Sequence, residues 1–224
     1  MLKMQDSLNN DMAGDKWKTR KTKEGRTTEY ELNAIGELIE HIESYPYKHW
    51  HDINRDPDIE NAQLELVDVF HFLLSMSMQR TERLSIAEIP GIMARTYSSA
   101  KEEVALLGDG VLTLELRSNL VRTLINKISG SSPMSTIFFS FFCLTEATDM
   151  NLDKLYRLYM IKNVLNQFRQ SKGDREGDRE GDYSRIWHGE EDNSYITSYL
   201  IENPDVDKES ILEYLEVTYK SLGL

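Results

Sequence analysis

The sequence is short of several residue types, and each shortage excludes a class of protein. Cys143 is the single cysteine among 224 residues, so an intrachain disulfide framework is impossible and a reducing compartment fits. The longest apolar block, near 138–144, is far shorter than the roughly 20 residues that span a bilayer. The N-terminus lacks the basic start and apolar stretch of a secretory signal. We therefore expect a soluble, cytoplasmic protein without a membrane partner, in which Cys143 is buried as a small apolar residue.

Basic residues are outnumbered as well. Lysine and arginine total 26 against 38 aspartates and glutamates, which gives a formal charge of -12. Sequence-independent binding to DNA or RNA needs a concentrated basic surface, so we expect no nucleic-acid polymer as partner. A small phosphate ligand remains compatible with this charge, because bound metal ions can reverse the local sign of an acidic pocket.

Helical periodicity dominates the sequence, because five prolines and twelve glycines interrupt it rarely and no run alternates apolar and polar residues convincingly. Proline after aspartate at 56–57 is typical of a helix start. We expect an all-α fold, a compact multi-helix bundle that forms one domain over 1–224 and carries a mobile lobe. The expected helices cover 2–13, 29–44, 57–80, 90–107, 110–129, 133–148, 150–170 and 205–221.

One segment differs from the rest. Residues 173–182 read GDREGDREGD, with the four residues GDRE present twice in tandem. Alternating charges and repeated glycines favour a flexible, solvated insertion loop. A flap that closes over a ligand is the alternative interpretation.

Two pairs of acidic residues carry the strongest chemical signal. Glu37 and Glu40 form an ExxE pair, and Glu65 and Asp68 form an ExxD pair. A spacing of three places both members of a pair on one helical face, one turn apart. Two such helices packed together could aim four carboxylates into one pocket, where hard cations such as Mg²⁺ prefer oxygen ligands.

The residues around the second pair bear on what the acids do. Apolar side chains flank them on nearly all sides of the expected helix 57–80, which is typical of a buried helix. Burying unpaired carboxylates is very costly, so they should be neutralised or bound to metal. From the residues alone, a metal site and an ordinary solvated acidic face remain alternatives.

Other metal and phosphate motifs are missing from the sequence. The histidines at 41, 49 and 51 lack the spacing of a zinc site, and neither a glycine-rich phosphate loop nor a dinucleotide fingerprint occurs. His71 lies one turn beyond Asp68, and we interpret it as a core histidine with satisfied hydrogen bonds rather than as a ligand.

Several separated blocks, in the right order, resemble one known family. They are MLKMQDSLNN at 1–10, ELIEHIESYPYKHW at 37–50, DIENAQLELVDVFHFLLS at 58–75, YRLYMIKNVLNQFRQ at 156–170 and IWHGEEDN at 186–193. These blocks are similar to the all-α dimeric dUTPases of the Campylobacter, trypanosomatid and phage type. Residues 82–148 carry little of the resemblance.

The resemblance implies a chemistry for the acidic pairs. By analogy Glu37, Glu40, Glu65 and Asp68 hold two or three Mg²⁺ ions, and a metal-bridging water attacks the phosphate chain of dUTP. The products are dUMP and pyrophosphate, and dUDP is accepted as well. The resemblance also implies a homodimer. Glu37 or Glu40 is expected to be the general base, with no means of choosing between them from the sequence.

The resemblance also assigns binding residues. The helix-face triplet Lys162, Asn166 and Arg169 matches positions that contact phosphate and nucleotide, although by spacing alone it is an ordinary basic face. Arg185 and Asn193 are expected to contact phosphate or ribose. Gln5, Asn9 and Trp17 lie in the block that implies uracil recognition, and amides can match both edges of that base. Trp17 and Trp50 are otherwise core or interface aromatics.

The sequence departs from the family at a few positions. Tyr47 stands where tryptophan is common, and His51 stands where lysine is common, which replaces a fixed charge by a pH-sensitive one. The GDRE repeat replaces a shorter segment that normally holds an aromatic residue and a lysine, for which Arg175 or Arg179 could compensate.

Two alternatives remain open at this point. Related helical pyrophosphatases act on dCTP or other nucleotides, and the acidic pairs do not distinguish these substrates. A helical interaction protein with vestigial acids belongs to a different class. It would show no metal-dependent release of pyrophosphate.

Overall fold

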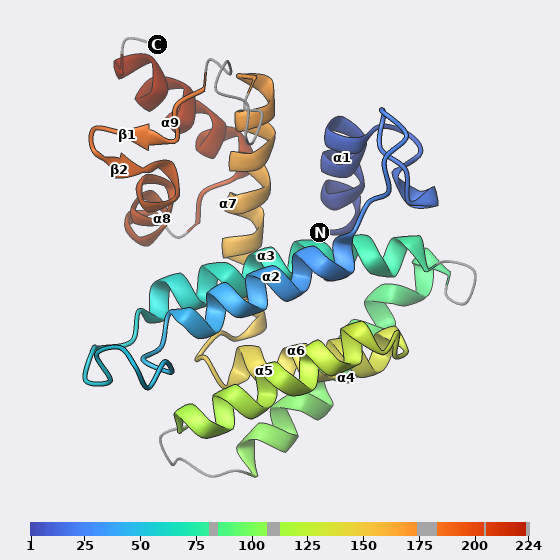
Figure 1. The fold of residues 1–224 in the computed structure, drawn as a ribbon. Coiled ribbons are helices and arrows are strands. Elements are labelled where there is room, and N and C mark those ends of the chain that lie inside the picture. Colours follow the sequence, from blue (N-terminus) through green and yellow to red (C-terminus); the bar gives the residue numbers. More distant parts are fainter. Residues whose placement is uncertain (81–84, 107–112, 174–182, 204, 223–224) are drawn as a thin grey trace.

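The computed structural model describes residues 1–80, 85–106, 113–173, 183–203 and 205–222. Helices dominate this part of the chain (Figure 1), so the expected all-α fold is confirmed. The helices are α1 (Leu2–Ala13), α2 (Tyr30–Glu43), α3 (Ile59–Gln79), α4 (Ile89–Ala105), α5 (Leu114–Ser129), α6 (Met134–Glu146), α7 (Leu152–Ser171), α8 (Asp192–Glu202) and α9 (Lys208–Ser221). Two 3-10 turns, Trp17–Thr19 and Ile86–Glu88, and one short hairpin of β1 (Ile186–Trp187) and β2 (Glu190–Glu191) complete the described elements.

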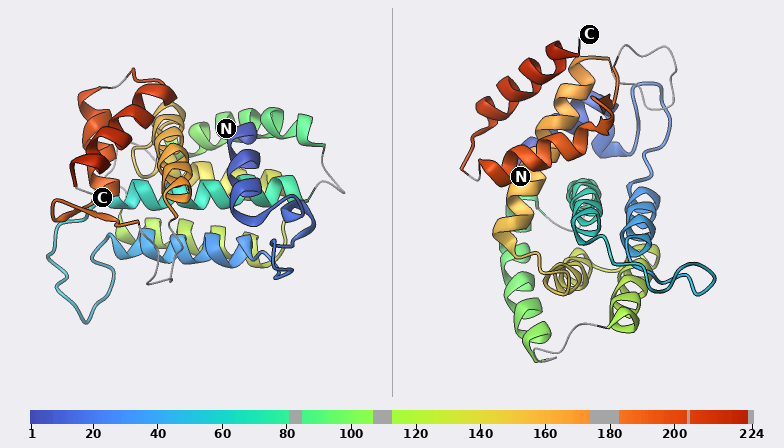
Figure 2. Two further views of the ribbon diagram at one scale, coloured as in Figure 1. Left: turned by 90° about the horizontal axis from the view of Figure 1, so that it is seen from above. Right: turned by 90° about the vertical axis from the view of Figure 1, so that its left-hand side faces the viewer.

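The centre of the molecule is the pair α2 and α3, which run side by side along their length (Figures 1 and 2). In α2, Ala34, Leu38 and Ile42 recur at the helical period and are buried against α3. In α3, buried residues occur around most of the circumference, as the apolar flanks of the ExxD pair predicted. Each leucine that is fully buried here contributes about 2 kcal/mol of hydrophobic stabilisation.

The other helices cover the two sides of this pair. Helices α4, α5 and α6 lie on one side, and α1, α7, α8 and α9 lie on the other (Figure 1). Cys143 of α6 is buried, as expected for a small apolar residue. Helix α7 stands across the central pair and contacts α1, α3, α8 and α9. Its side chains can therefore meet those of α2 and α3 on one side of the molecule.

The beginning of α3 differs by two residues from the expectation. The Asp58 side chain accepts a hydrogen bond from the backbone amide of Asn61 at 2.9 Å, so Asp58 is the N-cap and Pro57 lies before the helix. A cap of this kind stabilises a helix by about 1 kcal/mol. The cap fixes where α3 starts, one and a half turns or more before the ExxD pair.

The C-terminal segment was predicted less well. One helix was expected at 205–221, whereas the structure has α9 with Asp207 as its cap and, before it, α8 and the β1–β2 hairpin. Residues 174–182 of the expected insertion loop lie outside the described residues, and Gly173 adopts a positive φ of 80° at the end of α7. Among the described residues, none of the helices combines the length and the apolar character that crossing a bilayer requires.

Candidate active site

A cavity of about 890 Å³ is lined by α1, α2, α3 and α7 together with residues 22–30 and 185–194. Every residue predicted for the site except Trp17 lines this cavity. These residues are Gln5, Asn9, Glu37, Glu40, Glu65, Asp68, Lys162, Asn166, Arg169, Arg185 and Asn193. The separate sequence blocks thus converge on one place.

Trp17 is not brought to the cavity. Its side chain is fully buried in the 3-10 turn and meets Tyr30 edge to face, with ring centroids 6.2 Å apart. Tyr30 lines the cavity and stacks on Phe72, which lines it too. The position of Trp17 therefore agrees with the alternative interpretation of this residue as a core aromatic. Trp50, by contrast, is exposed on the segment between α2 and α3.

Three of the four predicted acids form a compact cluster. Carboxylate oxygens of Glu37, Glu65 and Asp68 all lie within 4.8 Å of one another, and the three side chains are half-buried. The helical spacing of three in each pair, and the packing of α2 against α3, produce this arrangement. Glu40 lines the same cavity but is exposed, and it lies outside the three-residue cluster.

The acid cluster is electrostatically unfavourable without a further cation. Burial raises the pKa of the Glu37 carboxyl, and the charges of Asp68, Glu40 and Glu65 raise it further. Burial followed by the Asp68 charge raises the pKa of Glu65 in the same way, and the ammonium of Lys162 opposes the increase. A group whose ionised form is penalised by burial and by like charges favours protonation or a bound cation.

The donor set fits a hard divalent cation. Three carboxylates within reach of one ion, open on the cavity side, match the oxygen ligands that Mg²⁺ takes while it keeps waters and substrate phosphates. Within the part of the chain that the structure describes, this is the one group of three or more acidic, histidine or cysteine side chains with that spacing.

Lys162 of α7 partly neutralises the cluster. Its ammonium nitrogen lies 2.8 Å from Asp68 Oδ2, and its side chain is only 8% exposed. The same nitrogen donates a hydrogen bond to Asn193 Oδ1 at 3.3 Å. Lys162 therefore links the acids of α3 to the start of α8.

Arg169, two turns further along α7, is held by an acid that the sequence analysis did not single out. Its guanidinium donates two hydrogen bonds to Asp192, at 2.8 Å from Nε and 2.5 Å from Nη2. The Tyr183 hydroxyl donates to the same carboxylate at 2.6 Å. Asp192 is fully buried and is the first residue of α8, so this network anchors α8 to α7. Its only sequence signal was the EDN triplet at 191–193.

Three residues that line the cavity, Gln5, Asn9 and His71, belong to a cluster of amides and hydroxyls. Gln5 Nε2 donates to Asn9 Oδ1 at 3.0 Å and to Ser75 Oγ at 3.2 Å, and Asn9 Nδ2 donates to Ser75 Oγ at 2.8 Å. Gln5 Oε1 lies 2.6 Å from His71 Nδ1 and accepts from the Tyr159 hydroxyl at 3.1 Å. Gln5, Asn9 and Ser75 are buried, so these contacts hold the side chains in fixed orientations.

His71 was expected to be a core histidine, and the structure places it both in the core and at the cavity. The ring is 5% exposed and stacks on Tyr159 with centroids 4.3 Å apart. Burial lowers the pKa of His71 to about 4, so the ring is neutral at physiological pH. Its Nε2 is buried and has no hydrogen-bond partner among the described residues, so the expectation of satisfied hydrogen bonds was only half right.

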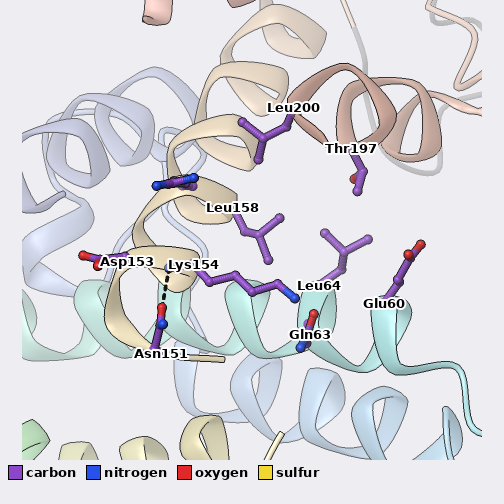
Figure 3. A pocket seen from close by; sticks show the side chains of 10 residues that line it. Glu60, Gln63, Leu64, Asn151, Asp153, Lys154, Leu158, Thr197 and Leu200 are labelled. Carbon is purple, nitrogen blue, oxygen red and sulfur yellow. Dashed lines mark hydrogen bonds between the residues drawn. The ribbon is translucent and has the colours of Figure 1, made fainter. Parts of the chain in front are cut away.

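A second cavity, of about 480 Å³, lies between the starts of α3 and α7 and helix α8 (Figure 3). Leu64, Leu158 and Leu200 line it, and the Lys154 side chain extends towards Gln63. Leu64 also lines the larger cavity. The walls mix both signs of charge, and the acids Glu60 and Asp153 do not belong to a three-residue cluster. The larger cavity is therefore the candidate active site.

A family model described as dUTPase matches residues 1–173, more than half of the chain. No curated protein matches the chain. The matched residues include α1, α2, α3 and α7, which carry the acid cluster, the amide cluster and the cations Lys162 and Arg169.

Proposed function

Because the chain belongs to the dUTPase family and is a hydrolase of the dUTP diphosphatase type, we propose that Mg²⁺ held by its acid cluster is required for converting dUTP to dUMP and pyrophosphate. We propose the same reaction for dUDP, with release of phosphate. The observation that carries this proposal is the convergence of Glu37, Glu65 and Asp68 within 4.8 Å in a cavity that Lys162, 2.8 Å from Asp68, also lines.

The acid cluster is the proposed metal site. Glu37, Glu65 and Asp68 would hold Mg²⁺, two or three ions in total, with Glu40 as a further ligand from the rim of the same cavity. When bound, such ions acidify water and offset charge on phosphate oxygens. The raised pKa values of Glu37 and Glu65 support this proposal, because a divalent cation would relieve the repulsion that raises them.

A base beside the attacking water completes the proposed chemistry. Glu37 and Glu40 are the two candidates, because both line the cavity beside the proposed metal site. Glu37 belongs to the acid cluster, and Glu40 is exposed beside it. A positioned carboxylate of either kind can accept a proton from the attacking water.

The remaining residues of the cavity are proposed to bind the nucleotide. Lys162, Asn166, Arg169, Arg185 and Asn193 supply cations and amides near the acid cluster, suited to phosphate and ribose oxygens. Arg169 would do so while its Asp192 pair keeps it in place. Asn9, together with Gln5 that holds it in place, lies in the cluster of amides and hydroxyls, where the uracil is proposed to bind. Trp17, buried away from the cavity, is not included in this proposal.

A nucleotide panel tests the proposal. Purified protein is incubated with dUTP, dUDP, dCTP, dTTP, dATP and dGTP, with Mg²⁺ and again with a chelator, and pyrophosphate or phosphate is measured. We expect hydrolysis of dUTP and dUDP with Mg²⁺ and loss of it with the chelator. Turnover that survives complete removal of metal would contradict the metal requirement, and preference for dCTP would contradict the substrate assignment.

Two broader expectations are also proposals. The exposed Trp50, 66% accessible, suits the interface of a homodimer, which the family resemblance implies. Action on a free nucleotide suits a cytoplasmic location. The non-enzymatic interaction protein is not carried further, because the chain belongs to an enzyme family and has all four acids.

A further inference from the structure

All hydrogen-bonding positions of the Gln5 amide are in use inside the protein. Its two N–H groups donate to Asn9 Oδ1 and Ser75 Oγ, and its oxygen faces His71 Nδ1 and the Tyr159 hydroxyl. A primary amide has two donor hydrogens and two acceptor lone pairs, so Gln5 has none left for a ligand. Asn9 uses one of each in this cluster and keeps one N–H and one lone pair.

The orientation of both amides depends on the single proton of Ser75. The Ser75 hydroxyl donates to the backbone carbonyl of His71, four residues earlier on α3, at 2.9 Å. With its proton committed there, Ser75 Oγ can only accept, so the NH₂ groups of Gln5 and Asn9 must face it. This arrangement satisfies every contact at Ser75, whereas the Tyr159 hydroxyl shares its one proton between Gln5 Oε1 at 3.1 Å and the Met1 carbonyl oxygen at 3.2 Å.

The reversed arrangement fails at the same hydroxyl. If both amides turned over, their mutual hydrogen bond would survive, but Gln5 Oε1 and Asn9 Oδ1 would both face Ser75 Oγ. Three oxygens, including the His71 carbonyl, would then compete for one proton. If only one amide turned over, two NH₂ groups or two carbonyl oxygens of Gln5 and Asn9 would face each other 3.0 Å apart. Buried polar contacts left unmade in this way are costly.

The orientation that Ser75 imposes on the Gln5 amide also decides which ring nitrogen of His71 carries the proton. Because Gln5 Oε1 faces His71 Nδ1, the neutral ring must carry its proton on Nδ1, and Nε2 is left as a bare acceptor. If Gln5 were reversed, its NH₂ group would face Nδ1, and the proton would move to Nε2. The tautomer of His71 is therefore decided by a hydroxyl on the next turn of α3.

We propose that the Ser75 hydroxyl makes this enzyme select uracil over cytosine, by fixing the polarity of Asn9 and the tautomer of His71. This inference rests on the proposed function, because it names how that site reads the base. Uracil offers an N3–H donor and an O4 acceptor, whereas cytosine offers an N3 acceptor and an N4 donor at the same places. A fixed acceptor on His71 Nε2 and a fixed N–H on Asn9 complement the first pattern and oppose the second. Gln5 and Ser75 act as positioning residues.

The ratio of kcat/KM for dUTP to kcat/KM for dCTP is the discriminating measurement. In Ser75→Ala the amides can adopt either polarity, and we expect the ratio to fall about tenfold or more, which corresponds to one ordinary hydrogen bond. Ser77→Ala is the matched control, because Ser77 is equally buried on α3 but donates to the Leu74 carbonyl, and its ratio should equal that of the wild type. Ser75→Thr keeps the hydroxyl and should keep the ratio.

Two further readouts separate this inference from the proposed function. Nitrogen-15 NMR of the ligand-free wild type should show His71 protonated on Nδ1, and Ser75→Ala should show a mixture of both tautomers. Calorimetry with dUMP and dCMP should show the same loss of selectivity in Ser75→Ala without requiring turnover, and the wild-type NMR measurement still decides the inference if the alanine variant does not fold. An unchanged dUTP preference in a folded variant, or an Nε2-protonated His71 in the wild type, would overturn the inference alone. Absence of hydrolysis in the wild type would overturn the proposed function, while the dUMP and dCMP arms still decide the inference.

Discussion

Lys162 places its ammonium nitrogen 2.8 Å from the Asp68 carboxylate, so a cation from α7 already lies beside the acid cluster of α2 and α3. One positive charge does not balance three half-buried carboxylates. The pKa values of Glu37 and Glu65 stay raised because burial and their neighbours still penalise ionisation. Several measurable consequences depend on this residual imbalance.

Replacing Glu65 by glutamine should abolish most of the activity and leave the fold intact. The change removes a proposed metal ligand and one repulsive charge, so dUTP hydrolysis should fall at least about 100-fold. Initial rates at saturating Mg²⁺ measure the effect. Glu60→Gln is the control, because Glu60 is exposed on the same helix and lines the second cavity. Equal rates for Glu65→Gln and wild type would contradict the proposed site.

The stability of the metal-free protein should depend on pH through the acid cluster. The folded-state pKa values of Glu37 and Glu65 lie above the ordinary value of 4.5. Stability from these groups is therefore fully present below that value and is lost as pH rises through the raised pKa values. Between pH about 5 and about 8 the Tm of the wild type should fall more steeply than that of Glu65→Gln. Parallel curves would show that Glu65 does not titrate as argued.

Magnesium should stabilise the folded protein through the same residues. A ligand that binds only the native state at 100 times its Kd adds about 2.7 kcal/mol to the free energy of unfolding. Thermal unfolding with Mg²⁺ and with a chelator measures this difference. We expect the increase to disappear in Glu37→Gln and to persist in Glu60→Gln. Equal increases in both variants would place the ion elsewhere.

The pair of Arg169 and Asp192 should be important for stability. Asp192→Ala leaves the buried guanidinium without its carboxylate, and breaking a buried pair in this way costs about 3–5 kcal/mol. Urea unfolding at neutral pH measures the loss. Glu216→Ala removes the partner of Lys172 in a more exposed pair and should cost about 1 kcal/mol or less. Similar losses in the two variants would contradict the anchoring role.

The proposed homodimer has a direct test. Light scattering coupled to gel filtration should give twice the chain mass of 26.0 kDa. Trp50→Ala should raise the protein concentration at which the dimer dissociates if this exposed ring lies in the interface, because interface tryptophans contribute strongly to binding. Exposed Leu106→Ala serves as the control. A monomeric mass at all concentrations would exclude the dimer.

The sequence was informative where chemistry follows helical spacing. Glu37, Glu65 and Asp68 could be placed together because pairs spaced by three share a helix face and apolar flanks imply burial. Asp192 and Ser75 could not be singled out, since each acts through contacts with residues distant in the chain. Helix α8 was missed because most of its residues are polar, β-branched or aromatic, and because its first residue is held by Arg169 rather than by a local cap. His71 was assigned to the core and not to the cavity, because helical periodicity indicates which face of a helix is buried but not whether a cavity opens beside that face.

The position of Asp192 has a consequence for any shortened form of this protein. The family match ends at residue 173, yet the carboxylate that holds Arg169 comes from residue 192. A fragment that stopped at the end of the match would keep every acid of the cluster but lose the counter-ion of a buried arginine, together with Arg185 and Asn193 on the cavity wall. We therefore expect a fragment limited to the matched region to be less stable and to hydrolyse dUTP more slowly than the full chain, because residues 185–194 line the same cavity.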